Sequence, residues 1–193
     1  MQRRTFMLST AAALGGFALA GCTTTPGGTS NAATNMSKRQ SIDAGVDNTL
    51  TKLYSTVKGS HELVAKSRGV LVFPSVLQAG FIVGAQYGEG ALRVGGATTG
   101  YYNTVSGSLG FQAGAQSKAI IFCFMTEDAL AKFRATDGWA AGADASVALV
   151  TVGANGVVDT NTATHPVEVF VLTNAGLMAD VSLAGTKVTR LNI

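Results

Sequence analysis

Charged residues are scarce in this sequence: 13% of its 193 residues are Asp, Glu, Lys or Arg, whereas 47% are hydrophobic. This composition excludes a chain that is disordered throughout, and it supplies a core of good size for one domain. Proline is also rare, with three residues against 24 glycines. Because the glycines follow no collagen period, they indicate tight turns and close backbone packing. No interior apolar run reaches the length of a membrane-spanning helix.

Cysteine and histidine number only two each. We expect no disulfide, because Cys22 lies in the export signal described below and leaves Cys123 alone in the apolar run IIFCF. A thiol in such a run is typical of a small core residue. His61 and His165 have no cysteine or carboxylate at ligand spacing. We therefore expect no metal site, and we expect both histidines to be surface or capping residues.

The motifs of nucleotide-binding and hydrolytic enzymes are also missing. Gly88 and Gly90 begin a GxG pattern, but Arg93 stands where a dinucleotide-binding loop requires glycine. The sequence has no Gly-Lys-Ser/Thr phosphate loop and no Gly-x-Ser-x-Gly elbow. The sequence therefore predicts neither an enzyme nor a bound cofactor.

The N-terminal residues have the pattern of an export signal. Arg3 and Arg4 precede an apolar run that is too short to span a membrane and ends in LAGC at residues 19–22. This ending resembles the lipobox of bacterial lipoproteins, which implies cleavage before Cys22 and lipidation of its sulfur. The alternative is a plain secretory signal with a chance cysteine. The start RRTF resembles a twin-arginine motif, although Gln2 departs from that pattern, so the twin-arginine and general secretory routes both remain open.

Removal of the signal changes the charge of the chain. Without Arg3 and Arg4, 12 of the 14 basic residues remain against 11 acidic ones, a net charge of +1. We therefore expect no nucleic-acid partner. We expect a protein of the bacterial cell envelope, lipid-anchored and facing the periplasm or the outer membrane. Residues 1–21 would be the signal peptide, residues 22–36 a flexible tether rich in Thr, Gly and Asn, and residues 37–193 the folded domain.

A helical pattern opens the domain. Apolar residues recur at helical spacing from Ile42 to Val64 and predict one long or two short amphipathic helices over residues 37–67, with a break near Gly59. A further helix is predicted after Thr126, whose hydroxyl can cap it, and it includes Phe133.

The remaining pattern has the two-residue period of strands. Residues 69–73 predict a buried strand that stops at Pro74. Residues 81–87 and 109–116 alternate apolar side chains with glycine or glutamine, which predicts paired strands with a smooth face that another element can approach closely. Further strands are predicted at residues 146–152, 167–173, 177–183 and 187–191. The fold class is therefore α+β: an N-terminal amphipathic helix packed on a largely antiparallel, Gly-rich sheet that is curved towards a barrel, with one further helix.

Several blocks of the sequence, in order, resemble the SYLF domain family. They are RGVLVFP at residues 68–74, QAGF at 78–81, YGEGAL at 87–92, GAQS at 114–117, GLMA at 176–179 and SLAG at 182–185. The resemblance implies a domain that binds membrane lipids, with phosphoinositides as ligands in animal relatives and actin as a partner in yeast relatives. It also implies a lipid-engaging amphipathic helix at the start of the domain, where residues 37–67 lie. For an exported protein we expect anionic phospholipids, and not actin.

Two functions follow from these observations. The first is a membrane-anchored lipoprotein whose SYLF-like domain binds anionic phospholipid. The second is a structural lipoprotein whose sheet face docks another envelope protein. Besides Cys22 as the lipidation site, the candidate lipid-binding residues are the basic residues of the helical segment: Lys38, Arg39, Lys52, Lys58, Lys66 and Arg68. They outnumber the acidic residues of the segment, Asp43, Asp47 and Glu62, by three.

Overall fold

The computed structural model describes residues 28–80, 83–109, 116–152, 157–158, 165–178, 182–183 and 185–193. Within these residues the chain has three helices and one nine-stranded sheet, which confirms the α+β class. The helices are α1 (Gly28–Thr56), α2 (Ser60–Lys66) and α3 (Glu127–Ala135). The strands are β1 (Gly69–Gly80), β2 (Val83–Val94), β3 (Ala97–Leu109), β4 (Gln116–Phe124), β5 (Trp139–Ala140), β6 (Val147–Leu149), β7 (Val167–Thr173), β8 (Gly176–Leu177) and β9 (Lys187–Leu191).

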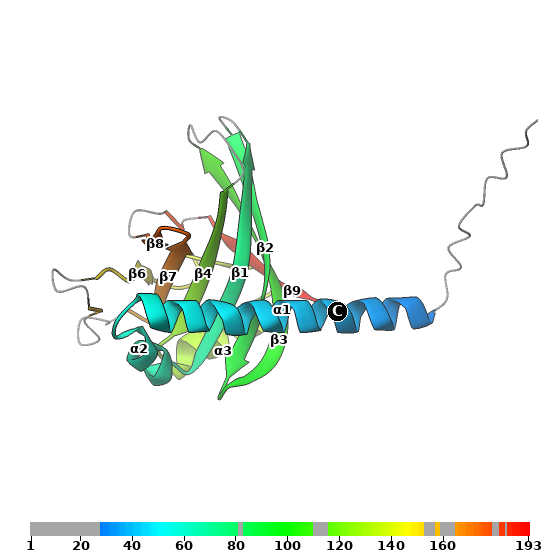
Figure 1. Cartoon of the computed structure of the whole chain (residues 1–193), viewed down its shortest axis with the longest axis horizontal. Helices are drawn as coiled ribbons and strands as arrows, with labels where there is room; N and C mark the ends of the chain where they lie inside the picture. The colour runs from blue at the N-terminus through cyan, green and yellow to red at the C-terminus, as the bar shows by residue number, and fades with distance from the viewer. Residues whose placement is uncertain are drawn as a thin grey trace, which may run out of the picture.

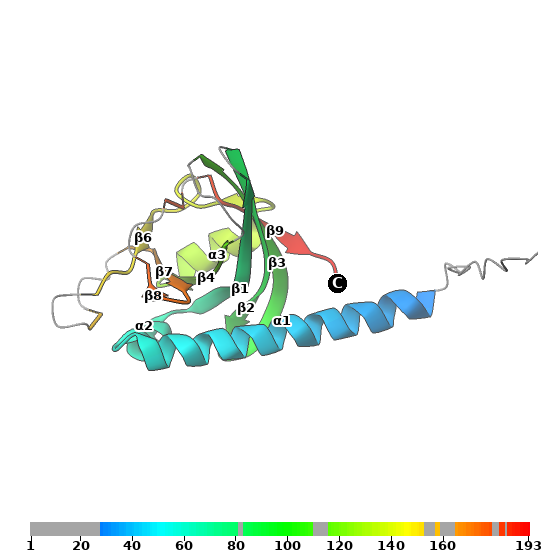
Figure 2. The same ribbon diagram turned by 45° about the horizontal axis from the view of Figure 1, so that its top comes forward.

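The sheet curls into a half-barrel, as the sequence predicted (Figure 2). Its strand order is β5-β9-β3-β2-β1-β4-β7-β6, and β8 pairs with β7 as a short hairpin. Among the named strands all pairs are antiparallel except β6 with β7. The centre of the sheet consists of the four longest strands, β3, β2, β1 and β4, which lie next to one another. Many of their residues are therefore paired across adjacent strands.

Two hydrophobic clusters lie on the two faces of this sheet. Helices α1 and α2 cover one face, where Val46, Leu53 and Leu63 pack on Val72 and Ile121 (Figure 1). Helix α3 lies on the opposite face, inside the curl (Figure 2). There its buried residues pack with a group of aromatic side chains contributed by the sheet and α3: Phe73, Phe122, Phe124, Phe133 and Trp139. Burial of two separate apolar faces is the main source of stability for the sheet.

The first helix differs from its prediction at its start. Its apolar stripe is buried as expected, and Gly59 separates α1 from α2 with a φ of 84° that favours glycine. However, α1 begins at Gly28, so residues 28–36 are helical where the sequence predicted part of the tether. Adding turns to an existing helix costs little compared with starting one, so the packed part of α1 can extend into an exposed polar segment.

The first strand also differs, because it continues through Pro74 to Gly80. Its pairing with both neighbours shifts register around this proline: between Val72 and Ser75 towards β2, and between Phe73 and Val76 towards β4. A proline is tolerated at such an irregularity because no ladder hydrogen bond is required from its nitrogen. The prediction that Pro74 stops the strand was therefore wrong.

The bulge explains why glycine occupies the facing positions of β2. A Cβ on Gly88 would lie 2.8 Å from the main-chain oxygen of Ser75, and one on Gly90 would overlap the main-chain oxygen of Val72. The sequence predicted that another element approaches this glycine face; at Gly88 the atoms that come close belong to the paired strand β1. Residues 110–115 of the strand predicted at 109–116 lie outside the described residues.

The other elements agree with the sequence to different degrees. Strands β7 and β9 have the predicted bounds, and α3 is capped as predicted, with the Thr126 hydroxyl accepting a hydrogen bond from the N–H of Ala129 at 3.2 Å. Strands β6 and β8 are shorter than predicted. Strands β3, β4 and β5 were not predicted. β3 consists largely of small and polar residues, β4 contains an apolar run that was interpreted only as core, and β5 has two residues.

Candidate functional site

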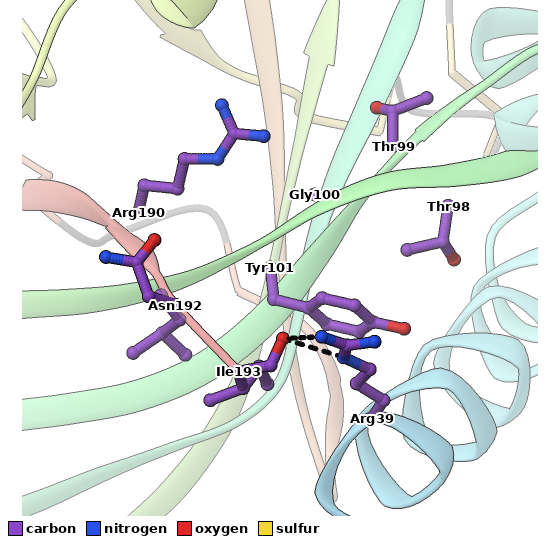
Figure 3. Close-up of a pocket in the computed structure, with 9 residues that line it drawn as sticks. Arg39, Thr98, Thr99, Gly100, Tyr101, Arg190, Asn192 and Ile193 are labelled. Atoms are coloured by element: carbon purple, nitrogen blue, oxygen red, sulfur yellow. Dashed lines mark hydrogen bonds between the residues drawn. The ribbon is translucent and has the colours of Figure 1, made fainter. Parts of the chain in front are cut away.

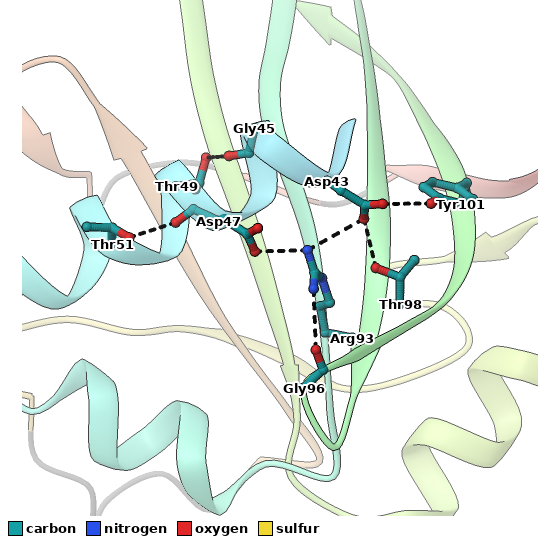
Figure 4. Close-up of polar contacts among 9 residues, drawn as sticks. All are labelled: Asp43, Gly45, Asp47, Thr49, Thr51, Arg93, Gly96, Thr98 and Tyr101. Atoms are coloured by element: carbon teal, nitrogen blue, oxygen red, sulfur yellow. Dashed lines mark hydrogen bonds and ion pairs between the residues drawn. The ribbon is translucent and has the colours of Figure 1, made fainter. Parts of the chain in front are cut away.

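A row of polar contacts joins α1 to the hairpin of β2 and β3 (Figure 4). One oxygen of Asp43 accepts a hydrogen bond from the Tyr101 hydroxyl at 2.8 Å, and the other accepts one from Thr98 at 2.7 Å. Burial, and then the hydrogen bond to Asp43, raise the pKa of Tyr101. The hydroxyl, which is protonated at neutral pH in any tyrosine, donates to Asp43 and fixes the turn of α1 that carries this residue.

Arg93 of β2 completes this connection. Its guanidinium lies 2.8 Å from Asp47 and 3.5 Å from Asp43, and it donates a third contact to the main-chain oxygen of Gly96 at 3.3 Å. Two carboxylates thus neutralise one guanidinium, which leaves little positive charge for an outside anion. We conclude that Arg93, Asp43 and Asp47 orient α1 on the sheet.

A second connection lies one turn earlier on α1. The ammonium of Lys38 is 2.8 Å from a Glu89 oxygen, and the Tyr87 hydroxyl donates to the same oxygen at 2.6 Å. Partial burial pushes the pKa of Glu89 upward, but the hydrogen bonds from Lys38 and Tyr87 outweigh burial and leave the pKa lowered. The bond to Glu89 raises the pKa of Tyr87 to about 12. Lys38, a predicted lipid-binding residue, is therefore partly used within the fold.

Arg39 lies beside Lys38 at the edge of an open pocket of about 680 Å³ (Figure 3). Its Nε donates to the main-chain oxygen of Ile193 at 2.7 Å, and a terminal N–H of the same guanidinium donates to that oxygen as well. The guanidinium carbon is 5.9 Å from the centre of the Tyr101 ring, within range of a cation–π contact. These contacts hold the positive group in a fixed position at the pocket.

Arg190 of β9 contributes a second guanidinium to this pocket, which we call the arginine pocket. In the described part of the chain Arg190 is exposed and has no hydrogen bond or ion pair. The pocket contains no carboxylate side chain among its lining residues, which are Arg39, Thr98, Thr99, Gly100, Tyr101, Arg190, Leu191, Asn192 and Ile193. Figure 3 shows the Arg190 side chain directed away from Arg39, because Arg190 pairs with Tyr102 whereas Arg39 packs on Tyr101. Guanidinium groups in a lining without a carboxylate side chain are suited to a phosphate or another anion.

The other predicted basic residues do not converge on this pocket. Lys52 lies 13 residues farther along α1 than Arg39 and donates to the main-chain oxygen of Thr173 at 3.2 Å. Lys58 is exposed between α1 and α2, Lys66 is exposed in the last turn of α2, and Arg68 pairs at 3.7 Å with the exposed Glu127. The helical segment therefore carries its positive charge in separate places. The sequence did not indicate Arg190, since only the fold brings it near Arg39.

A smaller pocket of about 300 Å³ lies between α1, α2 and the start of β1. Leu50, Tyr54, Val64 and Val70 give it mostly apolar walls. Arg93 reaches its rim, but it is paired with the two aspartates described above. We therefore regard the arginine pocket as the better anion site.

The titratable groups in the core do not form a reactive site. Cys123 is fully buried, which confirms it as a core residue, and burial, reinforced by Glu168, raises its pKa. Glu168 is 4% exposed; burial raises its pKa despite contacts with His165, which is itself 48% exposed. His61 is exposed and packs against the ring of Tyr54. Among the described residues no three His, Cys, Asp or Glu side chains gather as metal ligands.

Cys22 and the predicted signal peptide lie outside the described residues. Within the described ranges, none of the helices combines the length and the apolar character required to cross a bilayer. Membrane attachment through Cys22 thus stays a prediction from the sequence.

Comparison with known proteins gives one family. Residues 105–192 match the model of the family described as Ysc84, Las17-binding protein actin regulator, and a search of curated proteins found no match. The matched span runs from the middle of β3 to the end of β9, so it includes Arg190 but not α1. This family is one of lipid- or protein-binding domains. The segment from β3 to β9, which includes one side of the arginine pocket, therefore matches the SYLF (Ysc84) family, as the sequence resemblance predicted.

Proposed function

We propose that this protein is an exported lipoprotein of the bacterial cell envelope, anchored through Cys22, whose SYLF domain binds anionic phospholipid. The observation that carries the proposal is the arginine pocket, which Arg39 and Arg190 both line and whose lining residues include no carboxylate side chain. Guanidinium groups bind phosphate oxygens well because their N–H groups form a planar fork.

The position of Arg39 in the chain also supports binding to a membrane. Arg39 belongs to α1, the element that follows the proposed anchor in the chain, and Lys38 is next to it. Near an anionic surface each cation contributes about 1 kcal/mol, so a few basic groups give weak, salt-sensitive attraction. Weak attraction is sufficient for an anchored domain, since the tether raises its local concentration at the bilayer. Lys52, Lys58, Lys66 and Arg68 would add to this attraction from the same helical segment.

The test uses the full chain carrying Cys22→Ser, so that binding does not depend on the lipid anchor. Vesicles of phosphatidylcholine alone are compared with vesicles that also contain phosphatidylglycerol. Arg190→Glu reverses an exposed charge that holds no other group in place, and we expect it to weaken binding to the anionic vesicles by roughly 30-fold. Arg134→Glu is the matched control, because Arg134 is an exposed arginine of α3 outside the pocket.

Equal binding by Arg190→Glu and Arg134→Glu would refute the arginine pocket as the site. A second variant, with Lys52, Lys58 and Lys66 changed to glutamate, tests the helical segment separately. If this variant loses binding while Arg190→Glu does not, the lipid site is the helix face and not the pocket.

The alternative function is docking of another envelope protein by the sheet face. The description of the matched family names a protein ligand, which supports this alternative. Failure of the Cys22→Ser chain to bind any anionic vesicle at low salt would reject lipid binding and favour protein docking.

A further inference from the structure

Three exposed apolar side chains lie in one row across β1, β2 and β3. Leu77 pairs directly with Tyr87, and Tyr87 pairs directly with Val105. Their exposed fractions are 56%, 46% and 47%, and they are the exposed large apolar residues of the described sheet strands. Directly opposite residues of antiparallel strands share a face, so the three side chains project together. We call them the apolar row.

The apolar row lies on the face that α1 covers, immediately beyond the helix. Glu89, two residues from Tyr87 on β2, has its side chain on the same face and binds Lys38 of α1. Figure 1 shows β1 and β2 continuing past α1 on this side. The row is therefore where the sheet leaves the cover of the helix, and in the described structure no element covers it.

The residues around the apolar row carry a net positive charge, and some of them have small side chains. Val105 pairs with the exposed Lys187 of β9. At the border of the row next to α1, Lys38 forms an ion pair with Glu89. Glu89 is the only carboxylate on the adjoining described positions of this face, and Lys38 neutralises it. The exposed Ala85 and Gly107, which pair with each other next to the row, leave its side chains prominent.

We infer that the apolar row inserts into the interfacial zone of an anionic membrane, with Lys187 among the headgroups. This inference rests on the proposed function and adds a second contact, which is apolar. The area favours a lipid surface over a protein, because three half-exposed side chains offer roughly 300 Å². A stable protein partner covers about 800 Å² on each side. Tyrosine next to aliphatic residues and lysine is typical of side chains at the boundary between headgroups and acyl chains.

The row can be tested by removing apolar surface. In the Cys22→Ser chain, we expect Val105→Ser to lower the partition onto vesicles containing phosphatidylglycerol roughly fivefold, and Leu77→Ser with Val105→Ser roughly 30-fold. The matched control is Val152→Ser, because Val152 is equally apolar and 43% exposed but lies beyond β6 at the other edge of the sheet. Unchanged thermal melts show that the variants are folded.

Insertion itself can be measured with tryptophan. The native Trp139 is fully buried and gives a constant background. A Val105→Trp variant should shift its emission to shorter wavelength on binding and be quenched by lipids brominated in the acyl chain, whereas Val152→Trp should show neither effect. If the emission of the Val105→Trp variant does not respond to vesicles to which the protein is bound, the inference is overturned.

These results separate the two proposals. If Arg190→Glu abolishes vesicle binding while Leu77→Ser with Val105→Ser binds like the control, the proposed function stands and the inserted row is wrong. If Arg190→Glu and the Leu77→Ser with Val105→Ser variant both weaken binding, and only the effect of Arg190→Glu depends on salt, the proposed function and the inserted row are both supported. If the starting chain binds no vesicles, the proposed function fails and the inference fails with it.

Discussion

Gly90→Ala is expected to destabilise the domain strongly, because β1 leaves no space for a Cβ at this position. The added carbon would overlap the main-chain oxygen of Val72 and would lie 2.8 Å from the carbonyl carbon of Val72 and 2.7 Å from a ring carbon of Phe73. Two of these atoms belong to the main chain and the third to a ring that is fully buried, so none can move aside alone. Relief requires a shift of β1 at its bulge.

The expected cost is about 3 kcal/mol, at the upper end of the range for overpacked cores. For a domain of this size that corresponds to a fall in melting temperature of roughly 6–12 °C. Gly107→Ala is the control: Gly107 lies in β3, and a Cβ there would meet no atom within 4 Å. Alanine is slightly favoured over glycine in a strand, so this variant should be as stable as the original chain or about 0.5 kcal/mol more stable.

Urea unfolding followed by the fluorescence of the buried Trp139 measures both variants. Equal unfolding midpoints for Gly90→Ala and Gly107→Ala would refute the argument that the bulge at Pro74 requires glycine on β2. A fall in the midpoint without a change in the denaturant slope would locate the effect in the folded state.

Three further outcomes are expected. Thr126→Ala should cost about 1 kcal/mol in urea unfolding, because it removes the N-cap of α3, and a cost of zero would show that the cap is not needed. Glu168 has a raised pKa in the fold, so its stabilising contribution is present below its unfolded pKa and is lost as pH rises through the folded pKa. Glu168→Gln should therefore flatten the pH dependence of the urea midpoint above about pH 4. Parallel pH profiles for the variant and the original chain would contradict this. Cys22→Ser should release soluble protein or leave the precursor uncut, and an intact mass showing an unmodified Cys22 in the purified protein would disprove lipidation.

The elements predicted well are those whose signals are local. The bounds of β7 and β9 follow from short apolar or alternating runs, and the start of α3 follows from one hydroxyl residue before two acids. Of the strands that were missed, β3 is rich in small and polar residues and β5 has two residues, and each pairs with β9, which is distant in sequence. β4 contains the apolar run IIFCF, and its pairing with β1 and β7 is not visible locally. The error at Pro74 has the same cause, since a bulge is defined by the register of two neighbouring strands.

The candidate site shows the same limit. Arg39 was predicted because it belongs to a segment with excess positive charge, which is visible locally. Arg190 lies on the same face of β9 as the buried Val188 but is exposed, and only the fold brings β9 to the same pocket as Arg39. The pairing of Lys38 with Glu89 was equally hidden, because it joins α1 to the middle of β2.

The contacts of α1 also bear on the order in which the chain folds. Arg39 binds the main chain of Ile193, and Lys52 binds that of Thr173, so the first helix finds partners in the last strands. During synthesis α1 emerges early, yet its apolar stripe cannot be fully covered until β7 and Ile193 have followed. Contacts this distant in sequence slow folding. Incomplete chains would thus expose the apolar stripe of α1 to proteases. In the finished chain the stripe is buried in the same step that completes the half-barrel.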